Sequence, residues 1–269
     1  MFYVIKFLQF VSEVIGNRSI IFELVKNDFR SRYLGSYLGI LWAFIQPIAT
    51  ILIMWFIFAV GFKAGPVNGY PFVVWLMAGL LPWNFFSESL MSATHSVVDQ
   101  SYLVKKVVFK VNILPVVKIL SALIVHAVFL VILMVLLALY GYTPTMHFLQ
   151  LFYYLSASMA LVLGLSWMTS SLVVFFRDMG QIVAMILQFG FWLTPIFWSL
   201  EMIPERYHAL VKLNPVFYLI EGYRETFIFG EWIWNNPSGT LYFWGVTSIV
   251  FFLGAFIYMR LRPHFADVL

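Results

Sequence analysis

The chain has 269 residues, of which 62% are hydrophobic and only 10% are charged. A soluble domain typically carries about 25% charged residues, so this composition excludes a water-soluble fold and indicates a polytopic membrane protein. The apolar residues come in long uninterrupted runs, which favour helices over the short alternating strands of a barrel. The absence of cysteine excludes disulfide and thiol chemistry.

The first predicted element is an amphipathic helix at residues 17–33. Lys26 and Arg30 share one face of this helix, and four apolar residues lie on the opposite side. Asp28 and Arg32 intrude on the apolar side four residues apart, where they can form an ion pair. Such a helix would lie among lipid headgroups, either as a solvated anchor or as a docking surface for a partner.

Six apolar runs follow, and each is predicted to cross the membrane as a helix. A span needs roughly 20 apolar residues, and the first run has 25 residues without a charge. The second and third runs contain a few polar residues. The predicted spans are residues 38–62, 70–98, 113–140, 148–176, 181–198 and 241–259.

An even number of spans puts both termini on one side, and the distribution of Lys and Arg decides which side. Cytoplasmic segments carry the excess of these residues. Twelve lie on the side of the termini and four on the other, so both termini are predicted to be cytoplasmic. The twelve are Lys6, Arg18, Lys26, Arg30, Arg32, Lys105, Lys106, Lys110, Lys118, Arg177, Arg260 and Arg262, and the four are Lys63, Arg206, Lys212 and Arg224.

Two connecting segments carry more than a simple turn needs. Residues 99–112 mix three lysines with apolar residues, so they could bind anionic lipid or a partner protein, and the sequence leaves both interpretations open. Residues 199–238 contain two predicted short helices, one starting at Pro204 and one capped by Asn214 with Pro215 in its first position. Neither is long enough to cross, so both are predicted to be external re-entrant helices.

No motif indicates nucleotide hydrolysis or metal binding by this chain, because GxxxxGK[ST], HExxH and His/carboxylate clusters are all absent. The second span carries one polar stripe with spacings of four, three and four: Glu88, Ser92, His95 and Asp99. Residues on one helix face cannot form a Ser–His–Asp triad. The stripe is therefore either a proton or substrate path or a contact that joins helices, with His126 as the expected partner of Glu88.

Aromatic residues make up 20% of the chain, and many fit an interfacial belt or helix packing. Those along the first span could also line a path, because an aromatic face stacks on the apolar face of a sugar ring. The residues of this span that are predicted to do so are Trp42, Phe44, Trp55 and Phe56.

Four stretches, taken in order, carry a family resemblance. They are KNDFRSRYLGSYLGILWAFIQPI (26–48), LVKKVVFKVNILP (103–115), FFRDMGQIVAMILQFGFWLTPIFW (175–198) and LNPVFYLIEGYRETFIFG (213–230). Together they resemble the type 2 ABC exporter permeases of the polysaccharide branch, which export O-antigen, capsule and teichoic acid. Lys110 departs from the pattern, because members often have proline there, and this leaves the shape of that loop open.

The resemblance implies an all-α membrane protein with six transmembrane helices, in which 17–33 is an interface helix, 99–112 is a cytoplasmic coupling loop and 203–230 forms an external gate. It implies a homodimer in the bacterial inner membrane, with two separate ATP-binding subunits that bind ATP and Mg²⁺. This chain itself would hold no cofactor. The substrate would be a polyprenyl-linked glycan among membrane lipids, and no nucleic acid is expected.

The resemblance also assigns roles to residues. Coupling to the ATP-binding subunits falls to Tyr102, Lys105, Lys106, Phe109, Lys110, Lys26 and Arg30. The gate would use Tyr207, Phe217, Tyr223 and Arg224, and the pathway would add Phe189 and Trp192. Three alternatives remain at this point: a small-molecule or drug exporter of the same superfamily, a proton-coupled secondary transporter that uses Glu88 and His95, and a membrane-embedded glycosyl or acyl transferase.

Overall fold

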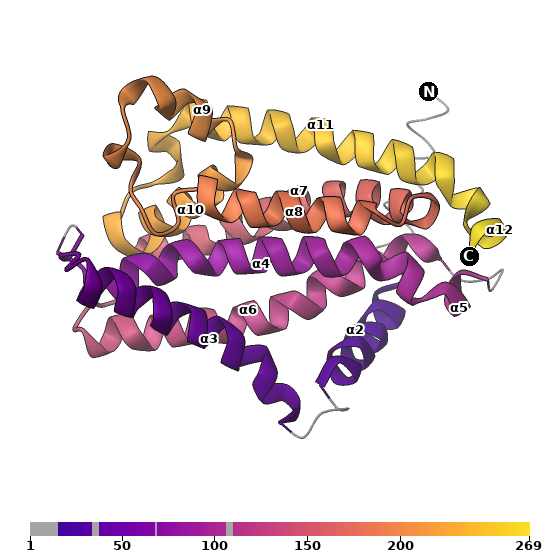
Figure 1. Ribbon diagram of the computed structural model, residues 1–269, viewed down its shortest axis with the longest axis horizontal. Helices are drawn as coiled ribbons and strands as arrows, with labels where there is room; N and C mark the ends of the chain where they lie inside the picture. Colours follow the sequence, from indigo (N-terminus) through magenta and orange to yellow (C-terminus); the bar gives the residue numbers. More distant parts are fainter. Residues whose placement is uncertain (1–15, 34–37, 68, 106–109) are drawn as a thin grey trace.

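The computed structural model describes residues 16–33, 38–67, 69–105 and 110–269. Within this part of the chain the fold is all-helical, which confirms the predicted class. Most long helices run along the length of the molecule, α2 lies across it, and short helices gather at its two ends (Figure 1). The end that holds α2, α5 and α12 is called the α2 end below, and the end that holds α9 and α10 is called the α9 end.

Long helices make up most of the described chain. They are α2 (Arg18–Tyr33), α3 (Trp42–Trp55), α4 (Phe72–Asp99), α6 (Leu114–Leu139), α7 (Gln150–Phe175), α8 (Met179–Leu193) and α11 (Pro237–Leu261). The short helices are α5 (Ser101–Val104), α9 (His208–Lys212), α10 (Pro215–Arg224) and α12 (Phe265–Val268). Short helical turns adjoin or connect these helices: η1 (Gly39–Leu41), η2 (Phe56–Gly61), η3 (Val111–Ile113), η4 (Met146–Leu149), η5 (Leu200–Met202), η6 (Glu205–Tyr207), η7 (Glu225–Phe229), η8 (Ile233–Asn235) and η9 (Arg262–His264).

Among the described residues, four helical stretches are long and apolar enough to cross a membrane, so the chain is a multi-pass membrane protein. They are Gly39–Gly61, Val111–Leu139, Met146–Phe175 and Pro237–Val268. The two other predicted spans, α4 and α8, do not belong to this set. The predicted number of six crossings therefore stays a prediction.

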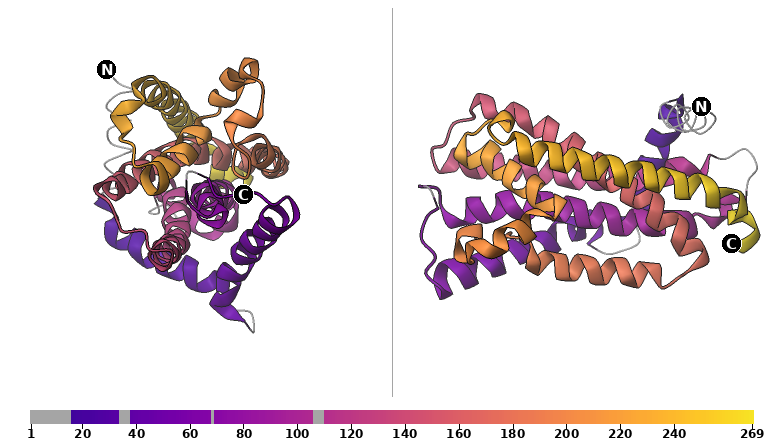
Figure 2. Two further views of the ribbon diagram at one scale, coloured as in Figure 1. Left: turned by 90° about the vertical axis from the view of Figure 1, so that its left-hand side faces the viewer. Right: turned by 90° about the horizontal axis from the view of Figure 1, so that it is seen from above.

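The helix α4 lies at the centre of the bundle. It packs against α6 and α7, and α3, α8 and α10 border it (Figure 2). Nineteen of its 28 residues are buried. The polar stripe lies on the side of α4 that remains open, because Glu88 and Asp99 are exposed and Ser92 and His95 are half-buried.

The helix α8 is 15 residues long and ends at Leu193 rather than at residue 198. The cause is local, because Pro195 restricts the residue before it to extended backbone. Thr194 has φ −88° and ψ 136°, and its hydroxyl donates to the carbonyl of Gly190 at 2.6 Å. The chain therefore leaves the helix just before Pro195 and continues through a series of bends.

Candidate functional site

The residues predicted to contact a partner lie on α2 and α5, at the same end of the molecule (Figure 1). On α2, Lys26 and Arg30 are exposed, whereas Ile21 and Val25 are buried against the start of α6. This burial pattern confirms the predicted amphipathic helix. It leaves the basic face of α2 open to a partner or to a membrane surface.

Beside α2, the segment that follows α4 presents further predicted coupling residues. Tyr102 is 72% exposed, Lys105 is exposed and Lys110 is half-buried. Lys106 and Phe109 lie outside the described residues. The exposed members add to the positive charge of the α2 end.

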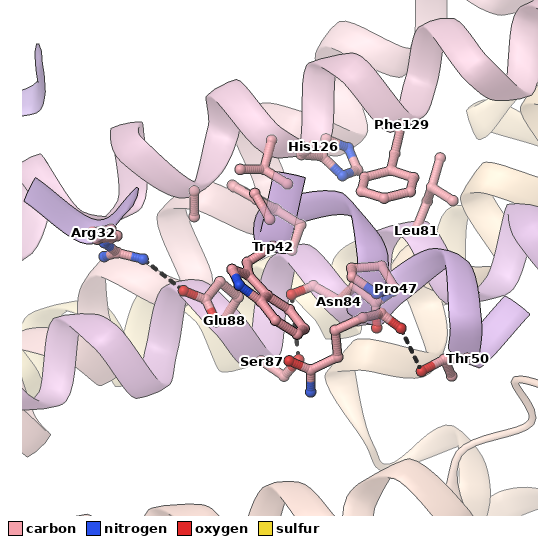
Figure 3. A pocket seen from close by; sticks show the side chains of 15 residues that line it. Arg32, Trp42, Pro47, Thr50, Leu81, Asn84, Ser87, Glu88, His126 and Phe129 are labelled. Carbon is pink, nitrogen blue, oxygen red and sulfur yellow. Dashed lines mark hydrogen bonds and ion pairs between the residues drawn. The ribbon is translucent and has the colours of Figure 1, made fainter. Parts of the chain in front are cut away.

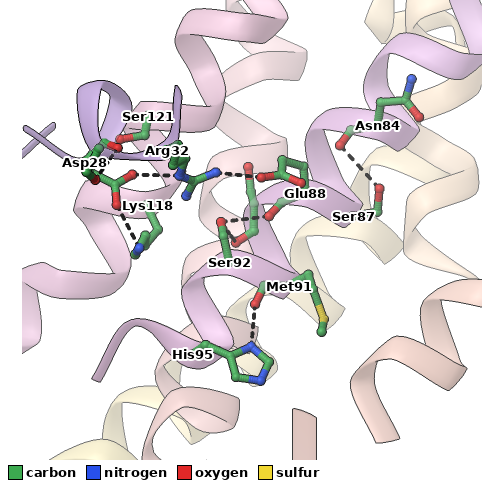
Figure 4. A network of polar contacts seen from close by, with 12 residues as sticks. Asp28, Arg32, Asn84, Ser87, Glu88, Met91, Ser92, His95, Lys118 and Ser121 are labelled. Carbon is green, nitrogen blue, oxygen red and sulfur yellow. Dashed lines mark hydrogen bonds and ion pairs between the residues drawn. The ribbon is translucent and has the colours of Figure 1, made fainter. Parts of the chain in front are cut away.

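A network of ion pairs ties α2 to the bundle (Figure 4). The Nε of Arg32 donates to Asp28 at 3.0 Å, which confirms the predicted pair, and its Nη1 donates to Glu88 at 2.6 Å. The Nζ of Lys118 lies 2.7 Å from Asp28 and 3.7 Å from Asp99. Because Asp28 is buried, its two cationic partners offset the cost of removing its charge from water. The network joins α2 to α4 and α6.

The predicted pairing of His126 with Glu88 is wrong. The Nε2 of His126 bonds the hydroxyl of Tyr223 on α10 at 2.9 Å, whereas Glu88 pairs with Arg32 on α2. Within the stripe, Ser92 and His95 bond backbone carbonyls of their own helix, at 2.8 Å and 3.2 Å. Glu88 and Asp99, at the two ends of the stripe, belong to the ion-pair network instead. In the parts of the chain that the structure describes, no three His, Asp or Glu residues gather in a way that could hold a metal ion.

The aromatic residues predicted to line a pathway lie on α3, η2 and α8. The helices α3 and α8 both pack on α4, and they lie on the same side of the bundle (Figure 2). Four of the six rings expose more than half of their surface: Trp42, Phe56, Phe189 and Trp192. Trp55 is 39% exposed, and Phe44 packs against Phe129 with ring centres 5.9 Å apart. These rings are open to a pathway, to lipid or to a second copy of the chain.

Of the predicted gate residues, Arg224 is inside the protein, with 1% exposure. Its guanidinium donates to the carbonyls of Pro195 at 2.8 Å and Ile196 at 2.7 Å, and pairs with Glu221 at 2.7 Å. It also lies 3.7 Å from the ring centre of Trp75 on α4. Burial lowers the pKa of Arg224 and Glu221 opposes that shift. Arg224 therefore connects α10 to α4 and to the segment that follows α8.

The other predicted gate residues differ in exposure. Tyr207 is 45% exposed beneath the guanidinium of Arg206, and Phe217 is half-buried. Tyr223 is fully buried, and its hydroxyl bonds His126 of α6. Next to these residues, Glu225 accepts a hydrogen bond from Tyr154 at 2.9 Å. Burial raises the pKa of Glu225, and the Tyr154 bond partly offsets this shift. Asn214 caps α10 as predicted, with its side chain accepting from the backbone of Val216.

A hollow of about 410 Å³ lies between α3, α4 and α6, near Arg32 of α2 (Figure 3). Trp42 and Gln46 line it from α3, Asn84 and Glu88 from α4, and His126 from α6. Seven of its fifteen lining residues are polar or charged: Arg32, Gln46, Thr50, Asn84, Ser87, Glu88 and His126. This hollow was not predicted from the sequence. Asn84 lies one helical turn before Glu88, so extending the polar stripe by four residues would have pointed to it.

These features define a class of protein. The chain is a multi-pass helical membrane protein with a basic amphipathic helix at one end and exposed aromatic residues on two of its helices. The profile of the ABC-2 type transporter family matches residues 20–228, and the chain belongs to that family.

Curated proteins resemble the chain over most of its length. An "O-antigen export system permease protein RfbA" of Klebsiella pneumoniae is 28% identical over 91% of this chain and 93% of its own length. A protein of the same name from Myxococcus xanthus is 28% identical over 97% of this chain and 99% of its own length. The "Polysialic acid transport protein KpsM" of Escherichia coli is 25% identical over 75% of this chain and 78% of its own length.

Proposed function

We propose that the chain is the permease subunit of an ATP-driven exporter that moves a lipid-linked, O-antigen-like polysaccharide from the cytoplasmic to the outer face of the bacterial inner membrane. The observation that carries the proposal is the similarity to O-antigen export permeases over nearly the whole of both chains. The exposed rings on α3 and α8 support it, because aromatic faces can pass sugars of varied structure.

In this proposal the α2 end faces the cytoplasm, both termini are cytoplasmic, and the chain crosses the membrane six times. Two copies of the chain pair, and two ATP-binding subunits dock at the α2 end, where they hold ATP and Mg²⁺. The exposed basic residues Lys26, Arg30 and Lys105 support the docking, because rim charges steer association and fix its register.

Transmission from the ATP-binding subunits begins at α2 and α5. Movement of α2 acts on α4 and α6 through the ion pairs of Asp28, Arg32 and Lys118. Tyr223 and Arg224 then tie α6 and the end of α8 to α10, so the external helices respond to motion in the bundle. Glu88, which suggested a proton-coupled transporter, is paired with Arg32, and no observation favours that alternative.

The proposal is tested by purifying the tagged chain from its native membrane in mild detergent. We expect a stoichiometric ATP-binding subunit with ATPase activity, and loss of surface polysaccharide when the chain is deleted. Charge reversal of Lys26 and Arg30 to Glu should abolish co-purification. The matched control reverses two basic residues at the α9 end, Arg206 and Lys212, and should leave it intact. Equal loss in both double variants, or no ATPase partner for the wild type, would contradict the proposal.

A further inference from the structure

Polar or charged side chains make up about half of the lining of the hollow between α3, α4 and α6. Gln46 and Asn84 line it, and neither side-chain amide has a hydrogen-bond partner among the described residues, where only their backbone carbonyls accept bonds. An amide offers two donors and an acceptor oxygen, and leaving these groups in an apolar environment is costly. An acyl chain is therefore a poor occupant, and the hollow suits a ligand rich in hydroxyl groups.

The charges around the hollow also select the ligand. Arg32 is already bonded to Asp28 and Glu88, and Lys118 is bonded to Asp28 and Asp99. The cluster contains three carboxylates and two cations, so an incoming phosphate meets no excess of positive charge. A neutral ligand avoids this repulsion. It can donate hydroxyl groups to the carboxylate of Glu88, whose side chain is 55% exposed.

The remaining walls suit a flat ring. The indole of Trp42 is half exposed at the hollow, opposite the polar side chains of α4 (Figure 3). A sugar ring has apolar C–H faces that pack on such a surface and a rim of hydroxyl groups that need both donors and acceptors. The volume of about 410 Å³ is near the low end of the ~300–1,000 Å³ that small-molecule sites have. It fits one or two rings rather than a length of polymer.

We infer that this hollow is a saccharide-binding site that holds one or two neutral sugar rings against Trp42, with their hydroxyl groups bonded to Gln46, Asn84 and Glu88. The inference rests on the proposed function, in which the substrate supplies such rings. The site lies within one copy of the chain, between α3, α4 and α6, and of the six rings predicted to line a pathway it includes Trp42. Its floor includes His126, which is bonded to α10, so an occupied site contacts the element that reaches the external helices.

The test uses the purified full chain in a detergent without a sugar headgroup, such as lauryldimethylamine oxide. Saturation-transfer NMR is recorded with methyl α-mannopyranoside, methyl β-glucopyranoside and methyl α-galactopyranoside as probes, and with glycerol phosphate as the anionic comparison. We expect at least one glycoside to bind and glycerol phosphate not to bind.

Variants locate the binding. Gln46→Leu and Trp42→Leu should weaken glycoside binding about tenfold, the effect of losing one hydrogen bond or one stacking face. The matched controls, Gln188→Leu on α8 and Trp234→Leu near α11, should bind as the wild type does. Asn84→Ala supplies the same test if a first variant does not fold.

Each outcome decides between the alternatives. No glycoside binding, binding that all variants share, or binding of glycerol phosphate alone would overturn the saccharide site. Because the isolated chain is used, these results do not depend on an ATP-binding subunit. Glycoside binding without an ATPase partner would refute only the exporter, and an ATPase partner without glycoside binding would refute only the hollow as a sugar site.

Discussion

Among the basic residues of the α9 end, replacing the buried Arg224 should lower the free energy of unfolding most. In Arg224→Met the carbonyls of Pro195 and Ile196 lose their donors at 2.8 and 2.7 Å, and each unsatisfied carbonyl costs about 1–3 kcal/mol. Two effects reduce the sum: the guanidinium no longer has to be buried, and the partly exposed Glu221 can turn to water. We expect a net loss of about 3 kcal/mol.

At about 2–4 °C per kcal/mol for a chain of this size, that loss lowers the thermal midpoint by roughly 6–12 °C. The assay is a thermal unfolding series in detergent, followed by the amount of monodisperse protein. The thermal midpoint of Arg224→Lys should fall between those of the wild type and Arg224→Met, because an ammonium cannot bond both carbonyls as the guanidinium does. Arg206→Met, an exposed arginine nearby, is the control and should change little. If Arg224→Met and the control have equal midpoints, the bonds of Arg224 do not stabilise the contact between α10 and the end of α8.

Three further predictions concern packing, ionisation and the α6–α10 contact. A Cβ on Gly254 of α11 would collide with the carbonyl oxygen of Gly164 on α7, whereas a Cβ on Gly245 would meet nothing within 4 Å. Gly254→Ala should therefore lose about 1–3 kcal/mol of stability in the same thermal series while Gly245→Ala keeps it, and equal midpoints would exclude the close helix approach. Burial raises the folded-state pKa of Glu225 above its unfolded value, so its ionised form costs stability above the folded pKa, and stability recovers as pH falls through that pKa. Glu225→Gln should flatten this part of the stability–pH profile, and a profile identical to the wild type's would contradict the assignment. Removing the 2.9 Å bond by Tyr223→Phe should destabilise by about 1 kcal/mol, and a double-mutant cycle with His126→Leu should show coupling of similar size; additive effects would mean that the bond contributes nothing.

Much of the architecture follows from hydrophobic pattern and local stereochemistry, which the sequence carries directly. The apolar runs indicated the helical membrane class, and the amphipathic pattern of α2 indicated which side is buried. The Asn214–Pro215 pair indicated the start of α10, because a capping side chain and a proline act within one turn. The ion pair of Asp28 with Arg32 was predictable for the same reason, since both residues lie one turn apart on one helix.

Contacts between helices far apart in the sequence depend on how the bundle packs, which no local pattern specifies. His126 was the expected partner of Glu88, but the packing of the helices pairs Glu88 with Arg32 on α2 and His126 with Tyr223 on α10. Arg224 was expected at an external gate, and packing placed it in the interior, between α4 and the end of α8. The hollow likewise exists only because α3 leaves space beside α4 and α6, so amides from separate helices come to face one cavity.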